Sequence, residues 1–202
     1  MIGILLTKTQ IERPIGDIGH PNTLPFPAVF ETASREEELL PLARNLKSRG
    51  AKTLITEHLT DPQKFHELSI PTFTSPLILL PTLIPSIPGK IAIFSDKEAS
   101  ITPKLLETYH VPPNFPLIPS GMDDMPAFTE AYVFGTRPID VEAINFELTF
   151  VTQRIRKANP DLGAIILMSP YMSAFRKAIQ EAADVPIYDI VSLVKFVHDS
   201  YS

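Results

Sequence analysis

Two matching stretches, Ala51-Lys-Thr-Leu-Ile-Thr56 and Ala164-Ile-Ile-Leu-Met-Ser169, decide the fold of this chain. Each is a short apolar run followed by a helical pattern and then by a second strand, which begins at Ile70-Pro71 or at Val185-Pro186. Strand–helix–strand units of this kind build parallel sheets. Because the same order occurs in both halves, the sequence predicts a duplicated α/β architecture.

The rest of the chain continues this alternation of apolar runs and helical patterns. The expected strands are 2–6, 53–56, 70–74, 90–94, 115–118, 164–168 and 186–188, and the expected helices are 34–50, 65–68, 102–109, 141–158, 173–183 and 191–197. Ser34 followed by Glu37 has the pattern of a capping box at the start of the first long helix. We therefore expect two similar α/β lobes with mostly parallel sheets, flanked by helices, and a site between the lobes.

The expected division of the chain follows the repeat. Residues 1–88 form an N-terminal lobe, residues 89–185 form a second lobe, and residues 186–202 are a closing strand and C-terminal helix that could pack on the first lobe.

Composition excludes several classes of function. The 202 residues include no cysteine, so there are no disulfides and no thiolate metal sites. The formal net charge is −5 and no basic run is concentrated on one face, which disfavours a nucleic-acid partner. The apolar start is cut off by Lys8, and prolines interrupt the uncharged stretch 69–89, so neither predicts a signal peptide or a membrane span. A cytoplasmic location is the default.

Candidate chemical groups follow the two repeated strands, because ligands of open parallel sheets bind beyond the carboxyl ends of the strands. Glu57 and His58 follow the first strand and could act as a general acid or base, or could be solvated loop residues. Ser169 follows the second strand and could be a nucleophile if His58 reaches it, could bind a carboxylate, or could cap the next helix. Tyr171 is a candidate proton donor or a residue that packs at the pocket rim.

Hydroxyl and amide side chains elsewhere are candidate substrate contacts. Thr74 and Ser75 end a predicted strand, and Ser75 before a proline is equally a simple helix start. Asn22 and Thr23 lie in a proline-rich loop and could bind a ligand or close a turn, and Thr56 ends the first repeated strand.

Other motifs point away from cofactors. Asp17 lies between two glycines and is expected in a turn. The histidines have no metal-ligand spacing, and no glycine-rich phosphate loop precedes a helix. We expect no metal and no organic cofactor.

Four segments stand out beyond the strand and helix pattern: the loop 16–27 (GDIGHPNTLPFP), Ile70-Pro-Thr-Phe-Thr-Ser75, Gly163-Ala-Ile-Ile-Leu-Met-Ser169 and Val185-Pro-Ile-Tyr-Asp-Ile190. Together they resemble the aspartate/glutamate/hydantoin racemase superfamily. The resemblance covers nearly the whole chain, with the motifs in the right order. It implies a small-acid site between two α/β lobes, with a cysteine from each lobe on either side of the substrate α-carbon and no cofactor. It also implies that hydroxyls such as those of Thr74 and Ser75 hold the substrate carboxylate, and that the chain forms a homodimer.

Both cysteine positions depart from the family. The second falls on Ser169, with Met168 and Pro170 where the family usually carries Glu and Thr. The first falls within Glu57-His58-Leu59: counting from Gly50 favours His58, and counting back from the next helix favours Leu59. A serine hydroxyl is far too weak an acid to replace a thiol, which argues against two-base racemisation.

Three hypotheses remain from the sequence. The first is a cofactor-independent isomerase, lyase, decarboxylase or cyclase that acts on a small carboxylic acid or carbonyl compound. In it, His58 or Glu57 is the acid/base, and the hydroxyls and amide described above orient the substrate. The second is a pseudoenzyme that binds a small acid without turnover. The third is a Ser–His hydrolase that uses Ser169 and His58.

Overall fold

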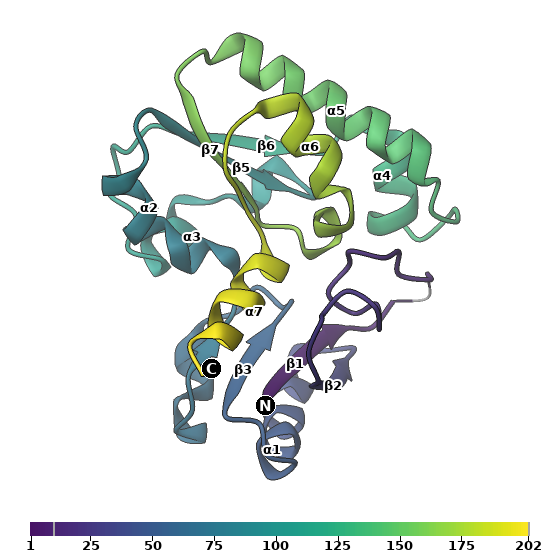
Figure 1. Ribbon diagram of the computed structural model, residues 1–202, viewed down its shortest axis with the longest axis vertical. Coiled ribbons are helices and arrows are strands. Elements are labelled where there is room, and N and C mark those ends of the chain that lie inside the picture. Colours follow the sequence, from purple (N-terminus) through teal and green to yellow (C-terminus); the bar gives the residue numbers. More distant parts are fainter. Residues whose placement is uncertain (10, 202) are drawn as a thin grey trace.

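A computed structural model describes residues 1–9 and 11–201 of the chain. It contains two four-stranded parallel sheets, one in each of two lobes (Figure 1). The first sheet has the order β2-β1-β3-β4 and the second the order β6-β5-β7-β8, so the second half of the chain repeats the topology of the first. The first sheet consists of β1 (Ile2–Thr7), β2 (Ala28–Ala33), β3 (Thr53–Thr56) and β4 (Thr72–Phe73). The second consists of β5 (Lys90–Ser95), β6 (Leu117–Gly121), β7 (Leu162–Leu167) and β8 (Ile187–Tyr188).

Helices cover both sheets. The α-helices are α1 (Leu39–Ser48), α2 (Leu80–Ser86), α3 (Pro103–Thr108), α4 (Pro126–Phe128), α5 (Val141–Ala158), α6 (Arg176–Ala183) and α7 (Ile190–Asp199). Short 3-10 turns are η1 (Glu36–Glu38), η2 (Pro62–Leu68), η3 (Pro76–Leu79), η4 (Glu98–Ser100) and η6 (Pro170–Phe175), and η5 (Thr129–Val133) is a π-helical turn.

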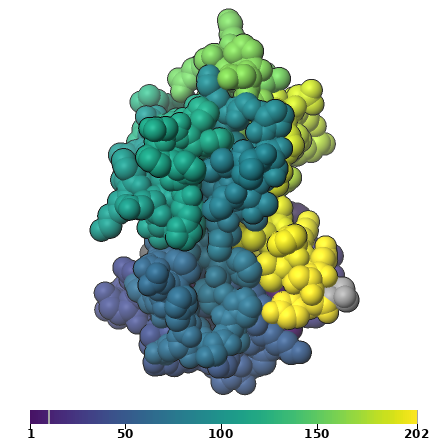
Figure 2. Space-filling model, turned by 90° about the vertical axis from the view of Figure 1, so that its left-hand side faces the viewer, coloured from purple at the N-terminus to yellow at the C-terminus, as the bar shows by residue number. Residues whose placement is uncertain are grey.

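The helix after the last strand of each sheet packs on the opposite lobe. Leu77 and Leu80, from η3 and α2, lie in one apolar cluster with Ile91 and Ile93 of β5. In the other direction, α7 packs its buried residues against β1 and β3 of the first sheet. Figure 2 shows α7, in yellow, lying against the blue first lobe. This reciprocal exchange buries apolar surface across the junction and ties the two lobes together.

The predicted fold class is confirmed, with local differences. The strand β2 was not predicted, because Ala28–Ala33 is a half-exposed edge strand without an apolar run. The predicted capping box of Ser34 and Glu37 is wrong: the carboxylate of Glu38 accepts from the Ser34 N–H at 2.7 Å. The strand expected at 115–118 lies at Leu117–Gly121.

The last segment, predicted as a closing strand and a C-terminal helix that could pack on the first lobe, divides between the lobes over its described residues 186–201. Ile187–Tyr188 pairs with β7 in the second sheet, and only α7 returns to the first lobe. Within residues 1–9 and 11–201, no helix has both the length and the apolar character needed to cross a bilayer.

Candidate functional site

The loops that follow β1, β3, β5 and β7 come together at the junction of the lobes. Gly16, in the loop after β1, has a φ of +100°, and a Cβ on it would lie 2.9 Å from the Cα of Ala174 in η6. This contact needs a glycine both for its backbone conformation and for the close approach. The first lobe therefore touches the second directly beside the residues that follow β7.

A buried ion cluster lies on the first-lobe side of this junction. The Arg13 guanidinium donates to both carboxylate oxygens of Glu57, at 2.5 and 2.8 Å, and to Asp17 Oδ1 at 2.7 Å. It also donates to the Thr7 carbonyl at 2.8 Å. Glu57 and Asp17 are buried, and Arg13 is almost so. Asp17 also accepts from the Gly19 N–H at 2.8 Å, so its predicted turn role is confirmed, in addition to its ion pair.

Burial and ion pairing act against each other in this cluster. Burial raises the pKa of Glu57, and the neighbouring Arg13 offsets that effect only in part. Burial tends to lower the pKa of Arg13, but its bonds to Glu57 and Asp17 outweigh burial, so the pKa lies above its usual range and the guanidinium stays charged. Both carboxylate oxygens of Glu57 accept hydrogen bonds, one from Arg13 alone and the other from Arg13 and from the Thr7 N–H, which donates at 2.7 Å.

A second carboxyl group, half-buried, stands on the other side of the junction. Asp96 directly follows β5, and its Oδ1 atom is buried without a hydrogen-bond partner. Ser169, after β7, is 3% exposed, and its Oγ is also unpartnered, although it lies near the Asp96 carboxyl. Burial raises the pKa of Asp96, while the Ser169 hydroxyl and the Lys97 charge oppose the effect. Unlike Glu57, Asp96 has an oxygen free to accept a proton.

Two stacked tyrosines lie near these groups. The rings of Tyr132 and Tyr171 are 4.7 Å apart and nearly parallel. Burial raises the pKa of Tyr171 to about 12, with further contributions from the charges of Glu57 and Asp96. Tyr171 is therefore close to the carboxyl groups of both lobes and keeps its phenolic proton at neutral pH.

Tyr132 reaches the junction from the π-helical turn η5. Burial raises its pKa, with the charge of Asp17 next in importance, and its hydroxyl has no partner. Turns of this kind are rare and frequent at functional sites, because they change the direction of a side chain within a helix.

The ends of β3 and β7 are equivalent in the two lobes, and this equivalence shows which residue after β3 corresponds to Ser169. The Glu57 N–H donates to the central strand β1 at 3.0 Å, and the Met168 N–H donates to the equivalent strand β5 at 2.8 Å. Glu57 thus corresponds to Met168, and the next residues, His58 and Ser169, correspond to each other. This internal symmetry favours His58 over Leu59 as the counterpart of Ser169.

His58 nevertheless turns away from the carboxyl cluster. Its Nε2 lies 3.3 Å from the Leu6 carbonyl, and its charged neighbour is Glu36. Burial lowers the pKa of His58, and these two groups oppose that shift. Since Ser169 Oγ has no partner, the two residues are not hydrogen-bonded as a dyad. Ser169 occupies the cap position of η6 but makes no side-chain cap bond, so the helix-cap interpretation is wrong.

The predicted substrate contacts at the strand ends of the first lobe are engaged by other protein groups. Ser75 accepts from the Leu77 N–H at 3.1 Å as the cap of η3, which confirms the helix-start interpretation. Thr74 lies 2.9 Å from the Tyr109 hydroxyl, and both side chains are buried. Thr56 accepts from the N–H of the residue two positions on, at 3.0 Å.

The two candidates in the proline-rich loop lie apart from the carboxyl groups. Thr23 accepts from the Gly16 N–H at 2.9 Å and so closes the loop. Asn22 is exposed, and its own N–H donates to His20.

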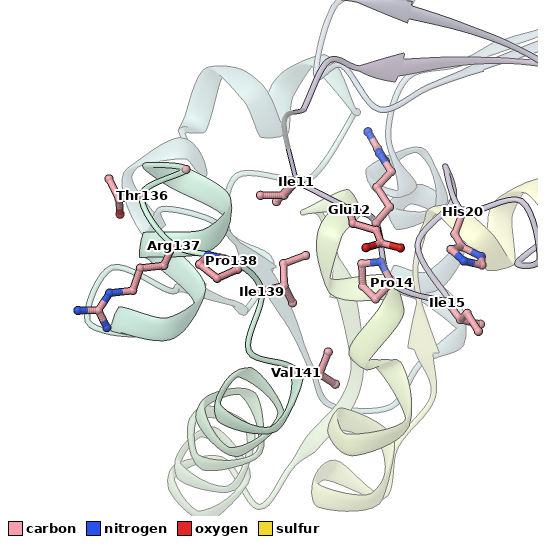
Figure 3. Close-up of a pocket in the computed structure, with 12 residues that line it drawn as sticks. Ile11, Glu12, Pro14, Ile15, His20, Thr136, Arg137, Pro138, Ile139 and Val141 are labelled. Carbon is pink, nitrogen blue, oxygen red and sulfur yellow. The ribbon is translucent and has the colours of Figure 1, made fainter.

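An open cavity of about 750 Å³ adjoins the ion cluster. In Figure 3 the loop after β1 and the loop before α5 supply its opposite walls. Apolar side chains dominate these walls, namely Ile11, Pro14, Ile15, Pro138, Ile139 and Val141. Arg13 belongs both to the wall and to the ion cluster, so the cavity reaches the edge of the buried centre. Within the described part of the chain, no three His, Asp or Glu side chains are placed to hold a metal ion.

Three residues of the centre were missed from the sequence. Asp96 follows a predicted strand, so the strand-end rule applied to β5 would have found it. Arg13 follows no strand end, and its partner Glu57 is 44 positions away in the chain. Tyr132 lies on a π-turn, for which the sequence carries no signal.

Comparison with solved structures finds the same fold in several proteins. The glutamate racemase from Thermus thermophilus in complex with β-chloro-D-alanine superposes with a TM-score of 0.60 at 15% identity, covering 98% of this chain and 79% of that one. The allantoin racemase from Klebsiella pneumoniae gives 0.58 at 14% identity, covering 98% and 87%. Unliganded arylmalonate decarboxylase gives 0.55 at 16% identity, covering 98% and 90%.

Comparison at the level of sequence finds no such relatives. No protein-family model matches the chain, and no curated protein sequence matches it significantly. The likeness is therefore one of fold.

Proposed function

We propose that this chain, which has the two-lobe fold of the Asp/Glu racemase superfamily and contains no cysteine, is a cofactor-independent enzyme with one-sided acid/base chemistry. Its reaction moves a proton at a carbon next to a carboxyl or carbonyl group, as an isomerase, lyase, decarboxylase or cyclase does. The solved structures of this fold carry both racemase and decarboxylase names, and the fold alone does not choose between them.

The observation that carries the proposal is the state of Asp96. A general acid or base works best when its pKa lies near the working pH, and burial moves the pKa of Asp96 upward. Its Oδ1 has no partner, so a proton can be placed there without first breaking a bond. We assign Asp96 as the acid/base in place of His58 and Glu57.

The neighbouring hydroxyls suit the same chemistry. Ser169 and Tyr171 keep their protons at neutral pH and can donate hydrogen bonds to the oxygen of an enolate-like intermediate. On the opposite side, both oxygens of Glu57 are held by Arg13. One face of the substrate therefore has a free base and the other has none, which supports proton transfer on a single face.

The second candidate is a binding protein that has lost turnover. It is favoured by Arg13, because both terminal nitrogens of this cation are already bonded to Asp17, Glu57 and the Thr7 carbonyl, so its charge is neutralised by protein carboxylates rather than kept for a substrate carboxylate. The third, a Ser–His hydrolase, requires His58 to turn toward Ser169. It predicts covalent labelling of Ser169 by an activated phosphonate.

Proton exchange in D2O separates these candidates. A panel of small amino, hydroxy, keto and malonate-type compounds is incubated with the protein and followed by proton NMR. We expect deuterium at an α-carbon, or loss of CO2, with the wild type and with the exposed control Asp124→Asn, and loss of this activity in Asp96→Asn. Exchange that survives Asp96→Asn but is lost in His58→Ala would refute the assignment. Line broadening of a ligand without any exchange would favour the binding protein.

The homodimer implied by the resemblance also belongs to this proposal. α5 exposes Phe146 and Phe150, 73% and 50% accessible, on one face, with Glu142 before them and Arg154 after them. Two copies of α5 packed antiparallel about an axis near Leu148 would pair each Phe146 with the partner's Phe150, and each Glu142 with the partner's Arg154.

Light scattering after size exclusion tests this arrangement. It should give a dimer for the wild type and a monomer for Phe146→Ser. A wild-type monomer at all concentrations would exclude the dimer, and a Phe146→Ser dimer would exclude this interface.

A further inference from the structure

We propose that the ligand of the buried centre is a small amine-bearing carbonyl compound, which enters as a cation and donates N–H bonds, rather than a simple carboxylate. The inference rests on the proposed function, since it names the substrate class of that site. It follows from an inventory of the polar atoms that the fold leaves without partners at the lobe junction.

The unpartnered atoms are all oxygens. Within the described residues, the buried side-chain atoms without a hydrogen bond are Asp17 Oδ2, Asp96 Oδ1, Tyr132 OH, Ser169 Oγ and Ser173 Oγ. Every residue in this set lies on one of the loops or turns that meet at the junction. Buried polar atoms are nearly always satisfied, so a group of them in one place indicates a missing partner.

The chemistry of these atoms defines that partner. The carboxylate oxygens only accept, and each hydroxyl both accepts and donates one proton. There is no unpartnered N–H group and no free ammonium or guanidinium among them. A ligand that completes the set must therefore supply more donors than acceptors, and an ammonium group supplies three.

The charge balance leads to the same class of ligand. The buried Arg13 faces Asp17 and Glu57, and Asp96 stands across the junction without a buried cation of its own. Lys97 is exposed, and Arg176 at the edge of the junction is paired with Asp189 at 2.9 Å. A ligand carboxylate would add a negative charge to a buried site that already has an excess of them, whereas an ammonium would reduce that excess.

Both lobes contribute acceptors to this set: Asp17 comes from the first lobe, and Tyr132, Asp96 and Ser169 come from the second. Asp17 and Tyr132 are close enough for the charge of one to act on the other, and Asp96 and Ser169 are close in the same way. Tyr171 is near both pairs. In the proposed complex, the ammonium group lies against Asp17 Oδ2 and the Tyr132 oxygen, and the carbonyl oxygen accepts from the Ser169 hydroxyl beside the acid/base Asp96.

Binding measurements with matched small molecules test the proposal without requiring turnover. L-alaninamide carries an ammonium and a carbonyl group but no carboxylate, propionate carries only the carboxylate, and alanine carries both charges. By calorimetry or saturation-transfer NMR at pH 7, we expect L-alaninamide to bind at least about tenfold more tightly than propionate, with alanine between them. Equal or tighter binding of propionate would overturn the proposal, and so would failure of L-alaninamide to bind at tens of millimolar.

Two variants localise the effect. Tyr132→Phe removes only an unpartnered hydroxyl and keeps the ring stacked on Tyr171, so the fold should be retained. We expect it to weaken L-alaninamide several-fold and to leave propionate unchanged. Tyr188→Phe makes the same chemical change in β8, where Tyr188 packs against an apolar cluster and is not among the unpartnered residues, so it serves as the matched control. It should leave both affinities unchanged. An identical L-alaninamide affinity in wild type and Tyr132→Phe would contradict this placement of the ammonium.

The outcomes also separate this inference from the proposed function. Selective binding of L-alaninamide without α-deuterium exchange would support the ligand class and contradict the proposed catalysis. Exchange of a keto acid such as pyruvate, without binding of L-alaninamide, would support the catalysis and overturn the ligand class.

Discussion

Replacing Arg13 with methionine should destabilise the protein by about 3–5 kcal/mol, because it leaves two buried carboxylates without their cation. The guanidinium makes hydrogen bonds to Glu57, to Asp17 and to the Thr7 carbonyl, and the side chains of both acids are fully buried. Methionine is close to arginine in length and keeps the apolar contacts of its stem. For a chain of this size, about 3–5 kcal/mol lowers the Tm by roughly 10 °C.

The loss should depend on pH with a definite sign. Burial already raises the pKa of Glu57, and removing Arg13 takes away the group that opposes this shift. When the pKa of a carboxyl group is higher in the folded than in the unfolded state, the unfolding free energy of the protein falls as the pH rises from the unfolded-state pKa to the folded-state pKa. The difference in unfolding free energy between wild type and Arg13→Met should therefore be smaller at pH 4 than at pH 7.

Urea unfolding at both pH values measures this difference. Arg44→Met is the matched control, because Arg44 pairs with Glu67 at the surface, where the two side chains are 58% and 48% exposed. Surface pairs contribute about 0–1 kcal/mol, so the control should lose less than about 1 kcal/mol at either pH. The reasoning would be refuted if Arg13→Met lost no more unfolding free energy than Arg44→Met, or lost the same amount at pH 4 and pH 7. The buried Arg13, Asp17 and Glu57 would then not form the ionised cluster described above.

Three further predictions concern the junction and its surroundings. Gly16→Ala should lower the unfolding free energy by about 2 kcal/mol or more, because the new Cβ would lie 2.9 Å from the Ala174 backbone. Gly135→Ala is the control: its φ is +63° but the space around it is open, so it should lose only about 1 kcal/mol through backbone strain. Thermal unfolding compares the two variants. Burial raises the pKa of Asp96, so the wild type should lose stability as the pH rises above the ordinary Asp range, and Asp96→Asn should lack that part of the loss. A series of urea titrations at different pH in which the variant matched the wild type would contradict this. Ser75→Ala should lose about 1 kcal/mol of cap energy in the same titrations and leave ligand binding unchanged, and altered binding would show that this hydroxyl belongs to the site.

The fold could be predicted from the sequence because its central strands are buried on both faces. The strands β1, β3, β5 and β7 therefore read as continuous apolar runs, which is the pattern of parallel sheets. In the edge strand β2 only Ala33 is buried, whereas Phe30 and Thr32 are exposed, and no local pattern separates this strand from a loop. The exchange of α2 and α7 between lobes is a tertiary feature that periodicity does not encode.

The site could be predicted only in part. Glu57, Ser169 and Tyr171 follow from the position of strand ends, and the structure places all three at the lobe junction. The direction of a side chain does not follow from its position: Glu57 turns inward and its neighbour His58 turns toward Glu36. Adjacent side chains point to opposite faces within a strand, but a loop has no such rule. The sequence therefore does not say which of two adjacent polar residues after a strand points into the site.

The most direct test of the account is a 13C NMR titration of the side-chain carboxyl groups in the unliganded wild-type protein. The account requires a carboxyl group at the lobe junction that has a buried oxygen and holds its proton more tightly than an ordinary aspartate. It predicts that the Asp96 carboxyl titrates above the usual Asp pKa of about 3.9, and that the signal assigned by Asp96→Asn disappears from that range. A titration of Asp96 at or below that value would show an exposed or paired carboxylate, and would contradict its role as the acid/base.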